Sequence, residues 1–168
     1  PNYSFLSECC TRRSCISMSL NEEDRNIVVK LQMGKAYLFL EQAKEMYKQH
    51  YWDIASNRYY YACYHAVQAL LIKNGLSCHT HDGLITSFGL HFVKTGKVDR
   101  KLGAFLSRIE QLRKKGDYNC VYSVSEEEIA TMIEPAKELI QRIEDLISEL
   151  NLPLTFLHTT EGFFLIPL

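Results

Sequence analysis

The chain has 168 residues, of which 46% are hydrophobic and 23% are charged, so it is long enough to bury a core and is predicted to form one domain. Its formal net charge of −1 excludes a strong overall positive field, so any contact with RNA or a nucleotide must come from a local cluster of basic side chains. No run of about 18 apolar residues is present, which argues against a transmembrane helix.

Residues 1–17 show no helical periodicity and are predicted to be a leader, disordered or non-native, ahead of a helix start after Met18. They lack the apolar stretch that a secretory signal needs. The six cysteines form no evenly spaced framework, and Cys63 falls in an apolar segment, where a free thiol packs as a small hydrophobic group. We therefore predict a reducing, cytoplasmic setting and no contact with a membrane.

Two helices are predicted in the first half of the chain. The first covers about residues 21–49, where acidic residues follow Asn21 in the first turn and apolar residues recur at three- and four-residue steps. The second covers about residues 52–74 and is apolar on nearly every face, which is typical of a helix in the middle of a bundle. It is expected to end at Asn74 and Gly75.

Three further helices are predicted in the second half. The third covers about residues 82–95, and the fourth covers about 98–115 and stops at Gly116. The fifth opens at a capping box, in which Ser125 is followed three residues later by a glutamate, and runs to about residue 150.

Pro135 lies inside the fifth predicted helix and is expected to kink it. Residues 152–168 are predicted to be a C-terminal tail that forms a short hairpin or an intermolecular contact. Since no convincing strand precedes them, residues 18–151 are predicted to be an all-α, antiparallel up-and-down bundle of four to five helices.

The second predicted helix is rich in tyrosine, and Arg58, Tyr61 and His65 share one of its faces because they lie three and seven positions apart. Arg113 continues the apolar stripe of the fourth helix, so it should point toward the bundle. A buried polar group costs about 1–3 kcal/mol unless it is paired. These side chains therefore either form a polar network or line a site, and two converging arginines would suit a phosphate.

Three motifs in this order resemble those of the HEPN superfamily, and the resemblance covers roughly residues 28–148. They are Arg-Tyr-Tyr-Tyr-Ala-Cys-Tyr-His-Ala at 58–66, Thr-His-Asp-Gly at 80–83, and Leu-Arg-Lys-Lys-Gly-Asp-Tyr at 112–118. The resemblance implies a helical bundle that is usually a homodimer, with the polar motif near the dimer cleft. Many members are metal-independent RNA-cleaving toxins paired with a minimal nucleotidyltransferase antitoxin.

Ribonucleases of this superfamily carry a histidine after four to six residues that follow the motif arginine. Here Tyr118, Asn119 and Cys120 occupy those positions after Arg113. The Arg-x-x-x-Asp-Tyr ending resembles a less characterised branch. A phenol with a pKa near 10 is a poor proton acceptor at neutral pH, so His65 is the candidate to replace the missing imidazole.

The candidate residues fall into two groups, and no metal or other cofactor is predicted. The candidate catalytic residues are Arg113, Asp117, Tyr118 and His65. The candidate nucleotide- or RNA-binding residues are Arg58, Tyr61, His81, Lys114 and Lys115. Most have a structural alternative: an ion pair between Arg113 and Asp117, aromatic packing for the tyrosines, and a solvated helix end for the lysines. For the histidines the alternatives are a hydrogen-bonded core position for His65 and a helix-entry hydrogen bond for His81.

The function predicted from these residues is binding of a nucleotide or an RNA phosphate at a dimer cleft, in a toxin–antitoxin-like module with a minimal nucleotidyltransferase. The alternatives are a non-catalytic interaction or dimerisation module and a metal-independent ribonuclease. Tyr118 could also accept a nucleotidyl group from the partner enzyme. An unchanged intact mass after incubation with that transferase and ATP would contradict this hypothesis.

Overall fold

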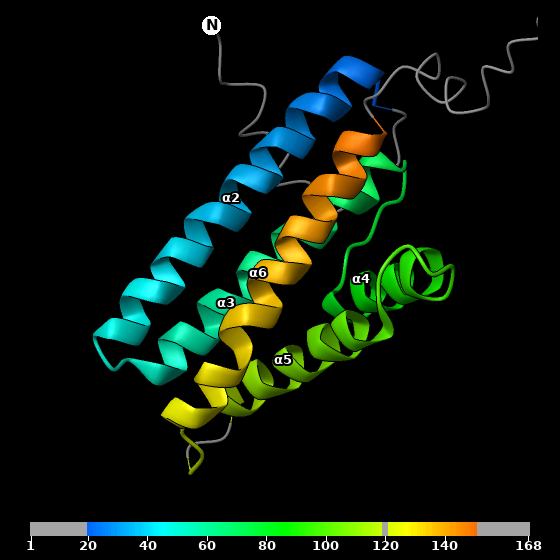
Figure 1. The fold of residues 1–168 in the computed structure, drawn as a ribbon. Coiled ribbons are helices and arrows are strands. Elements are labelled where there is room, and N and C mark those ends of the chain that lie inside the picture. The colour runs from blue at the N-terminus through cyan, green and yellow to red at the C-terminus, as the bar shows by residue number, and fades with distance from the viewer. Residues whose placement is uncertain (1–19, 119–120, 151–168) are drawn as a thin grey trace, which may run out of the picture.

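The computed structural model describes residues 20–118 and 121–150, and the regular structure in these residues is helical throughout (Figure 1). The predicted all-α bundle is confirmed. The predicted leader and tail lie outside the described residues. The elements are α2 (Glu22–Lys48), α3 (Trp52–Lys73), α4 (His81–Phe88), the π-helical turn η1 (Gly89–Val93), α5 (Arg100–Tyr118) and α6 (Glu126–Glu149).

Two of the predicted helix boundaries differ from the structure. The third predicted helix is divided into α4 and η1, because the hydrogen bonding changes to a π turn at Gly89. The fourth does not stop at Gly116 but continues to Tyr118. A Cβ at Gly116 would lie 3.6 Å from Oδ1 of Asp53, an ordinary contact, so this glycine sits in a packed helix end rather than in a turn.

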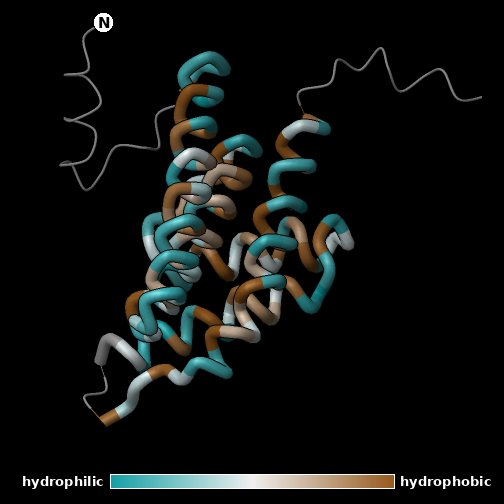
Figure 2. Tube along the Cα trace, turned by 60° about the vertical axis from the view of Figure 1, so that its left-hand side comes forward, coloured by the Kyte–Doolittle hydropathy of each residue, from teal (hydrophilic) through white to brown (hydrophobic). Residues whose placement is uncertain are grey.

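Helix α3 is the centre of the bundle, as its apolar pattern predicted, and it packs against α2, α4, α5 and α6. Its middle is buried on most sides, and the tube in Figure 2 shows hydrophobic and hydrophilic positions alternating along the surrounding helices. Helices α2 and α3 are joined by a short turn in which His50 takes a φ of 62°. None of the described helices is long and apolar enough to span a bilayer.

Helix α6 continues through Pro135 as one element. A proline has no N–H, so it leaves the carbonyl four residues earlier, that of Thr131, without its helical partner. The guanidinium of Arg108 on α5 supplies donors there, at 3.4 Å from the carbonyl oxygen and 3.2 Å from the hydroxyl of Thr131. The capping box predicted at Ser125 is present, with both reciprocal hydrogen bonds to Glu128.

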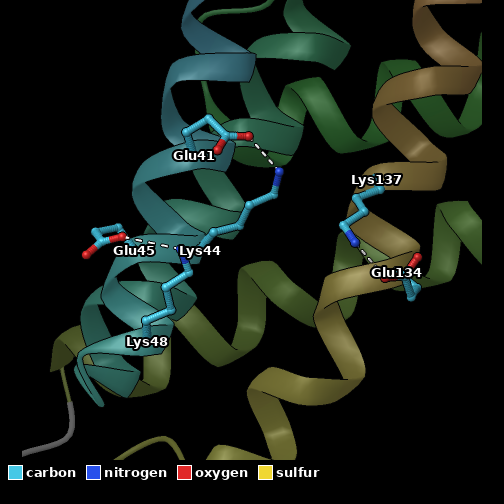
Figure 3. A network of polar contacts seen from close by, with 6 residues as sticks. All are labelled: Glu41, Lys44, Glu45, Lys48, Glu134 and Lys137. Carbon is cyan, nitrogen blue, oxygen red and sulfur yellow. Dashed lines mark hydrogen bonds and ion pairs between the residues drawn. The ribbon is translucent and has the colours of Figure 1, made fainter.

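The exposed faces of α2 and α6 carry ion pairs between side chains one turn apart (Figure 3). Lys44 lies 2.6 Å from Glu41, and Lys137 lies 2.6 Å from Glu134. Such exposed pairs contribute about 0.2–1 kcal/mol each. They belong to the solvated surface and do not indicate a site.

Asp53, in the first turn of α3, holds the segment that follows α5. Its Oδ1 accepts the backbone N–H of Val124 at 2.8 Å, and its Oδ2 accepts the hydroxyl of Ser123 at 2.8 Å. Both bonds join parts of the chain that are about 70 residues apart. The start of α3 is thereby fastened to the loop between α5 and α6, close to the end of α5 that carries Arg113.

Candidate functional site

The Arg113 side chain points into the bundle, and only 8% of the residue is exposed. Its guanidinium carbon lies 5.1 Å from the centre of the Tyr60 ring and 5.9 Å from that of Tyr61, both on α3. Stacking on ring faces leaves the N–H groups of a guanidinium at its edges, where they can bond an anion in the plane. The expected orientation of Arg113 toward the bundle is confirmed, and its neighbours are aromatic rings.

Tyr60 connects this arginine to His81 at the start of α4. The Tyr60 hydroxyl oxygen lies 2.6 Å from Nδ1 of His81, and the two ring centres are 5.6 Å apart. Burial and, as a smaller effect, the negative charge of Glu110 raise the pKa of Tyr60. Burial and then the positive charge of Arg113 lower the pKa of His81, although Glu110 acts in the opposite direction. Both groups are therefore neutral at pH 7.

Tyr61 and Tyr64 extend the aromatic cluster along α3 on its half-exposed side. Tyr64 packs on His81 with ring centres 4.8 Å apart and on His65 with centres 5.5 Å apart, edge to face. Tyr61 lies 6.1 Å from His81 and 6.4 Å from His65, measured between ring centres. The partly exposed rings of Tyr61, Tyr64, His65 and His81 thus form one continuous surface, here called the ring surface, which links the two imidazoles.

The far end of this surface is formed with α2. His65 stacks on Phe39 with ring centres 5.2 Å apart, and the Arg58 guanidinium lies 5.0 Å from the centre of the same Phe39 ring. Nδ1 of His65 lies 2.7 Å from the side-chain oxygen of Gln32, so the imidazole donates there and its Nε2 carries the lone pair. Burial and, as a smaller effect, the positive charge of Lys35 lower the pKa of His65 to about 4.

The two lysines after Arg113 differ in their surroundings. The Lys114 ammonium lies 2.7 Å from the carboxylate of Glu110, which is 5% exposed, and 3.2 Å from that of Asp82. Lys114 thus neutralises a buried acid and ties α5 to α4. The Lys115 side chain is exposed, with its ammonium 6.0 Å from the centre of the Tyr122 ring. It is a solvated helix end, as the structural alternative predicted.

Comparison with known proteins decides the family. Residues 29–146, well over half of the chain, match the HEPN domain. A UPF0332 protein of Thermotoga maritima is 37% identical over 132 residues, which cover 79% of this chain and 98% of the relative. The chain belongs to the HEPN family. Two proteins of Methanocaldococcus jannaschii, each named "Putative toxin", are also similar: one is 32% identical over 111 residues (66% of this chain, 82% of the relative), and the other is 24% identical over 118 residues (70% and 80%).

The HEPN match contains every residue of the ring surface, and the structure brings several of the predicted site residues together there. Arg113, Tyr61 and His81 meet at one end, while Arg58 and His65 share Phe39 at the other. The two arginines contact different rings, so they do not converge on one point as expected. His65 does not lie against Arg113 but is separated from it by Tyr61 and Tyr64.

For two of the predicted catalytic residues, Asp117 and Tyr118, the structure describes the helical backbone but not the side chain. The expected helix-entry bond of α4 comes from Thr80, whose hydroxyl accepts the N–H of Gly83 at 3.0 Å, and not from His81. A threonine before a helix start is the stronger cap. The imidazole of His81 is directed to Tyr60 instead.

Sequence reasoning missed five contributors to this surface as individual site residues. Tyr60 and Tyr64 were considered only as packing aromatics, and Phe39 and the partners Gln32 and Glu110 were not singled out. The signal for the tyrosines was present, since their spacing of four places them on one face of α3 together with Tyr61. Nothing local marks Gln32, because its role depends on the packing of α2 against α3.

Two further features bear on ligand chemistry. The described residues contain no cluster of three or more His, Cys, Asp or Glu side chains that could hold a metal ion. A groove of about 360 Å³ lies between α2 and α6, and neither Arg113 nor any residue of the ring surface lines it. Its mixed lining consists of Asn26, Val29, Lys30, Met33, Glu144, Ile147 and Ser148.

Proposed function

We propose that this HEPN protein binds the phosphate and bases of single-stranded RNA on the ring surface, as the toxin-like component of a two-component module with a minimal nucleotidyltransferase. The observation that carries the proposal is a mostly buried guanidinium stacked on Tyr60 and Tyr61 beside half-exposed aromatic and imidazole rings. The names of the two Methanocaldococcus relatives support the toxin-like assignment.

The aromatic part of the surface suits unpaired bases. Proteins bind single strands by stacking bases on aromatic rings, at about 1–3 kcal/mol per base, and place cationic side chains beside the backbone. Tyr61, Tyr64 and His65 offer partly accessible rings in succession along α3. A duplex could not use them, because its bases are already stacked on one another.

The phosphate would lie at the Arg113 end. A guanidinium forms paired, charge-assisted hydrogen bonds to phosphate oxygens, which is the strongest contact that this surface offers to an anion. The net charge of −1 gives no general attraction for nucleic acid, so affinity depends on this local contact and on stacking. Lys114 is engaged by Glu110 and Asp82 and contributes less.

Binding is favoured over cleavage by the state and place of His65, the candidate for the missing imidazole. Cleavage through the RNA 2′-hydroxyl requires a proton acceptor and a proton donor on either side of the phosphate. His65, with a pKa of about 4 and a lone pair on Nε2, is a weak base and lies away from Arg113. A metal-independent ribonuclease therefore remains the second candidate, and RNA cleavage that persists in EDTA would identify it.

Thermal unfolding with added ligand tests the proposal. A short single-stranded RNA with a Kd near 10 μM, present at a hundredfold excess over that Kd, should raise the free energy of unfolding by about 2.7 kcal/mol. This corresponds to an increase of several degrees in Tm. Double-stranded RNA and inorganic phosphate are the matched controls and should give much smaller shifts. An unchanged Tm with single-stranded RNA, ATP and GTP would favour the interaction module instead.

We also propose that two copies pair through the outer face of α2. Ile27, Leu31 and Leu38 are 47%, 52% and 55% exposed, and their spacing of four and seven places them on one stripe opposite the core face. Pairing two α2 helices antiparallel would place the acidic first turn at residues 22–24 beside Lys48 in the last turn of the other copy. An antiparallel pair of these helices would therefore bring opposite charges together at both ends of the apolar stripe.

Substituting both leucines of this stripe should separate the copies. Leu31→Glu with Leu38→Glu places carboxylates in the shared apolar seam, so light scattering after gel filtration should give the mass of a single chain. Leu90→Glu is the matched control, because Leu90 is equally exposed at 52% but lies on η1. It should leave the dimer intact. A wild-type protein that elutes as a single chain at micromolar concentration would contradict this interface.

A further inference from the structure

We propose that Tyr60 is a positioning residue that fixes His81 with its proton on Nε2, so that His81 presents a neutral hydrogen-bond donor beside Arg113. The inference deepens the proposed function. Its ligand-binding arm rests on that function, whereas the state of the imidazole in the free protein does not. No role for Tyr60 beyond packing follows from the sequence.

The argument begins with the Tyr60 hydroxyl. Tyr60 is completely buried, and buried hydroxyl groups in proteins almost always form hydrogen bonds. Among the hydrogen bonds of the described residues, the only partner of this hydroxyl is Nδ1 of His81, at 2.6 Å. Since the phenol keeps its proton at neutral pH, it must donate that proton to Nδ1. Nδ1 therefore carries the lone pair.

The tautomer of His81 follows directly. A neutral imidazole has one N–H, so when Nδ1 accepts a bond the proton lies on Nε2. Adding a second proton at Nδ1 would leave two donors facing each other and the Tyr60 proton without an acceptor. Nε2 has no partner among the described residues, and His81 is partly exposed, so its N–H is available to a ligand.

Charged side chains on α4 and α5 also influence whether His81 takes up a second proton. Arg113 and Lys114 on α5 disfavour a second positive charge on the imidazole, whereas Glu110 on α5 and Asp82 on α4 favour it. Lys114 neutralises both acids by direct contact, at 2.7 Å and 3.2 Å. The acids therefore provide little compensation for the arginine, and the neutral form prevails.

Arg113 and His81 would therefore make different kinds of contact with the ligand. Arg113 provides charge and paired donors, and His81 provides one uncharged donor. Such a pair suits an anion with a second acceptor close by, such as a phosphate next to a base carbonyl or a ribose oxygen. It does not suit a proton acceptor, because the basic nitrogen of His81 is already occupied by Tyr60. His81 is thus a binding group and not the missing catalytic base.

Long-range ¹H–¹⁵N NMR of the imidazole nitrogens tests the tautomer in the free protein. In the wild type at pH 7 the signals of His81 should show a protonated Nε2 and an unprotonated Nδ1. Tyr60→Phe keeps the ring under Arg113 but removes the donor, so it should shift His81 toward a mixture of tautomers. Tyr59→Phe is the matched control, because it removes a buried hydroxyl from the same helix without touching His81.

A wild-type His81 protonated on Nδ1 would overturn the proposal, and this measurement needs no variant. An unchanged His81 tautomer in Tyr60→Phe would equally overturn it. For binding, fluorescence anisotropy with a short single-stranded RNA should show about a tenfold loss in His81→Ala. His81→Gln retains an amide N–H near the position of Nε2 and should recover most of the affinity. Equal losses in the two variants would contradict a donor role.

The two proposals fail in different ways. If the wild type shows no affinity for single-stranded RNA but His81 carries its proton on Nε2, the function is wrong and the inference about Tyr60 stands. If RNA binds and His81 carries its proton on Nδ1, the function stands and the role of Tyr60 is wrong.

Discussion

Arg113→Ala should lower the affinity for short single-stranded RNA by about tenfold to a hundredfold or more, because each hydrogen bond between charged groups is worth about 1.5–3 kcal/mol. Arg113→Lys should recover only part of the loss, since an ammonium keeps the charge but lacks the planar pair of donors. Both can be measured by fluorescence anisotropy at fixed salt, which matters because phosphate contacts weaken as salt rises.

Arg108→Ala provides a matched control for this result. Arg108 is on the same helix and also has its guanidinium near an aromatic ring, 5.9 Å from the centre of Phe105. It lies outside the ring surface and faces Thr131 on α6. Its removal should leave RNA affinity unchanged. Equal losses for Arg108→Ala and Arg113→Ala would indicate nonspecific attraction and would contradict a site at Arg113.

The same glycine-to-alanine substitution should have opposite effects at two positions. At Gly103 a Cβ would lie 2.8 Å and 3.2 Å from the two methyl carbons of Val93, where α5 crosses η1. Valine is short and branched and cannot swing aside, so Gly103→Ala should cost about 1–3 kcal/mol through overpacking. At Gly34 on α2 no atom of the same chain lies within 4 Å, so Gly34→Ala should add about 0.5–1 kcal/mol to the stability of the single chain. Because Gly34 falls on the α2 stripe proposed to pair two copies, this gain is measured in the Leu31→Glu, Leu38→Glu background, in which the copies should be separate.

Urea unfolding of the two variants and the wild type measures both effects, and a double variant identifies their origin. Val93→Ala should relieve the clash, so its combination with Gly103→Ala should be more stable than the sum of the separate losses predicts. Strict additivity would show that the two side chains do not meet. A stabilised Gly103→Ala would show that η1 and α5 are farther apart than in the structure.

Most of the fold can be read from local patterns in the sequence. The capping box at Ser125 and the acidic first turn after Asn21 predict the starts of α6 and α2, and both are present. The continuous apolar surface of residues 59–72 predicts that α3 lies in the centre. These features are local because a helix satisfies its own backbone, so residues three and four apart already determine its faces.

For the candidate site, less can be predicted from the sequence than for the fold. The sequence by itself determined that Arg113 points inward and that Arg58, Tyr61 and His65 share a face of α3, since helical spacing alone sets both. Only the tertiary structure decided which groups meet: Tyr60 with His81, His65 with Gln32, and Lys114 with Asp82. The paired residues are 21, 33 and 32 positions apart in the sequence, and their geometry depends on how side chains from different elements pack together. The protonation states of His65 and His81 follow from that packing and not from their neighbours in the chain.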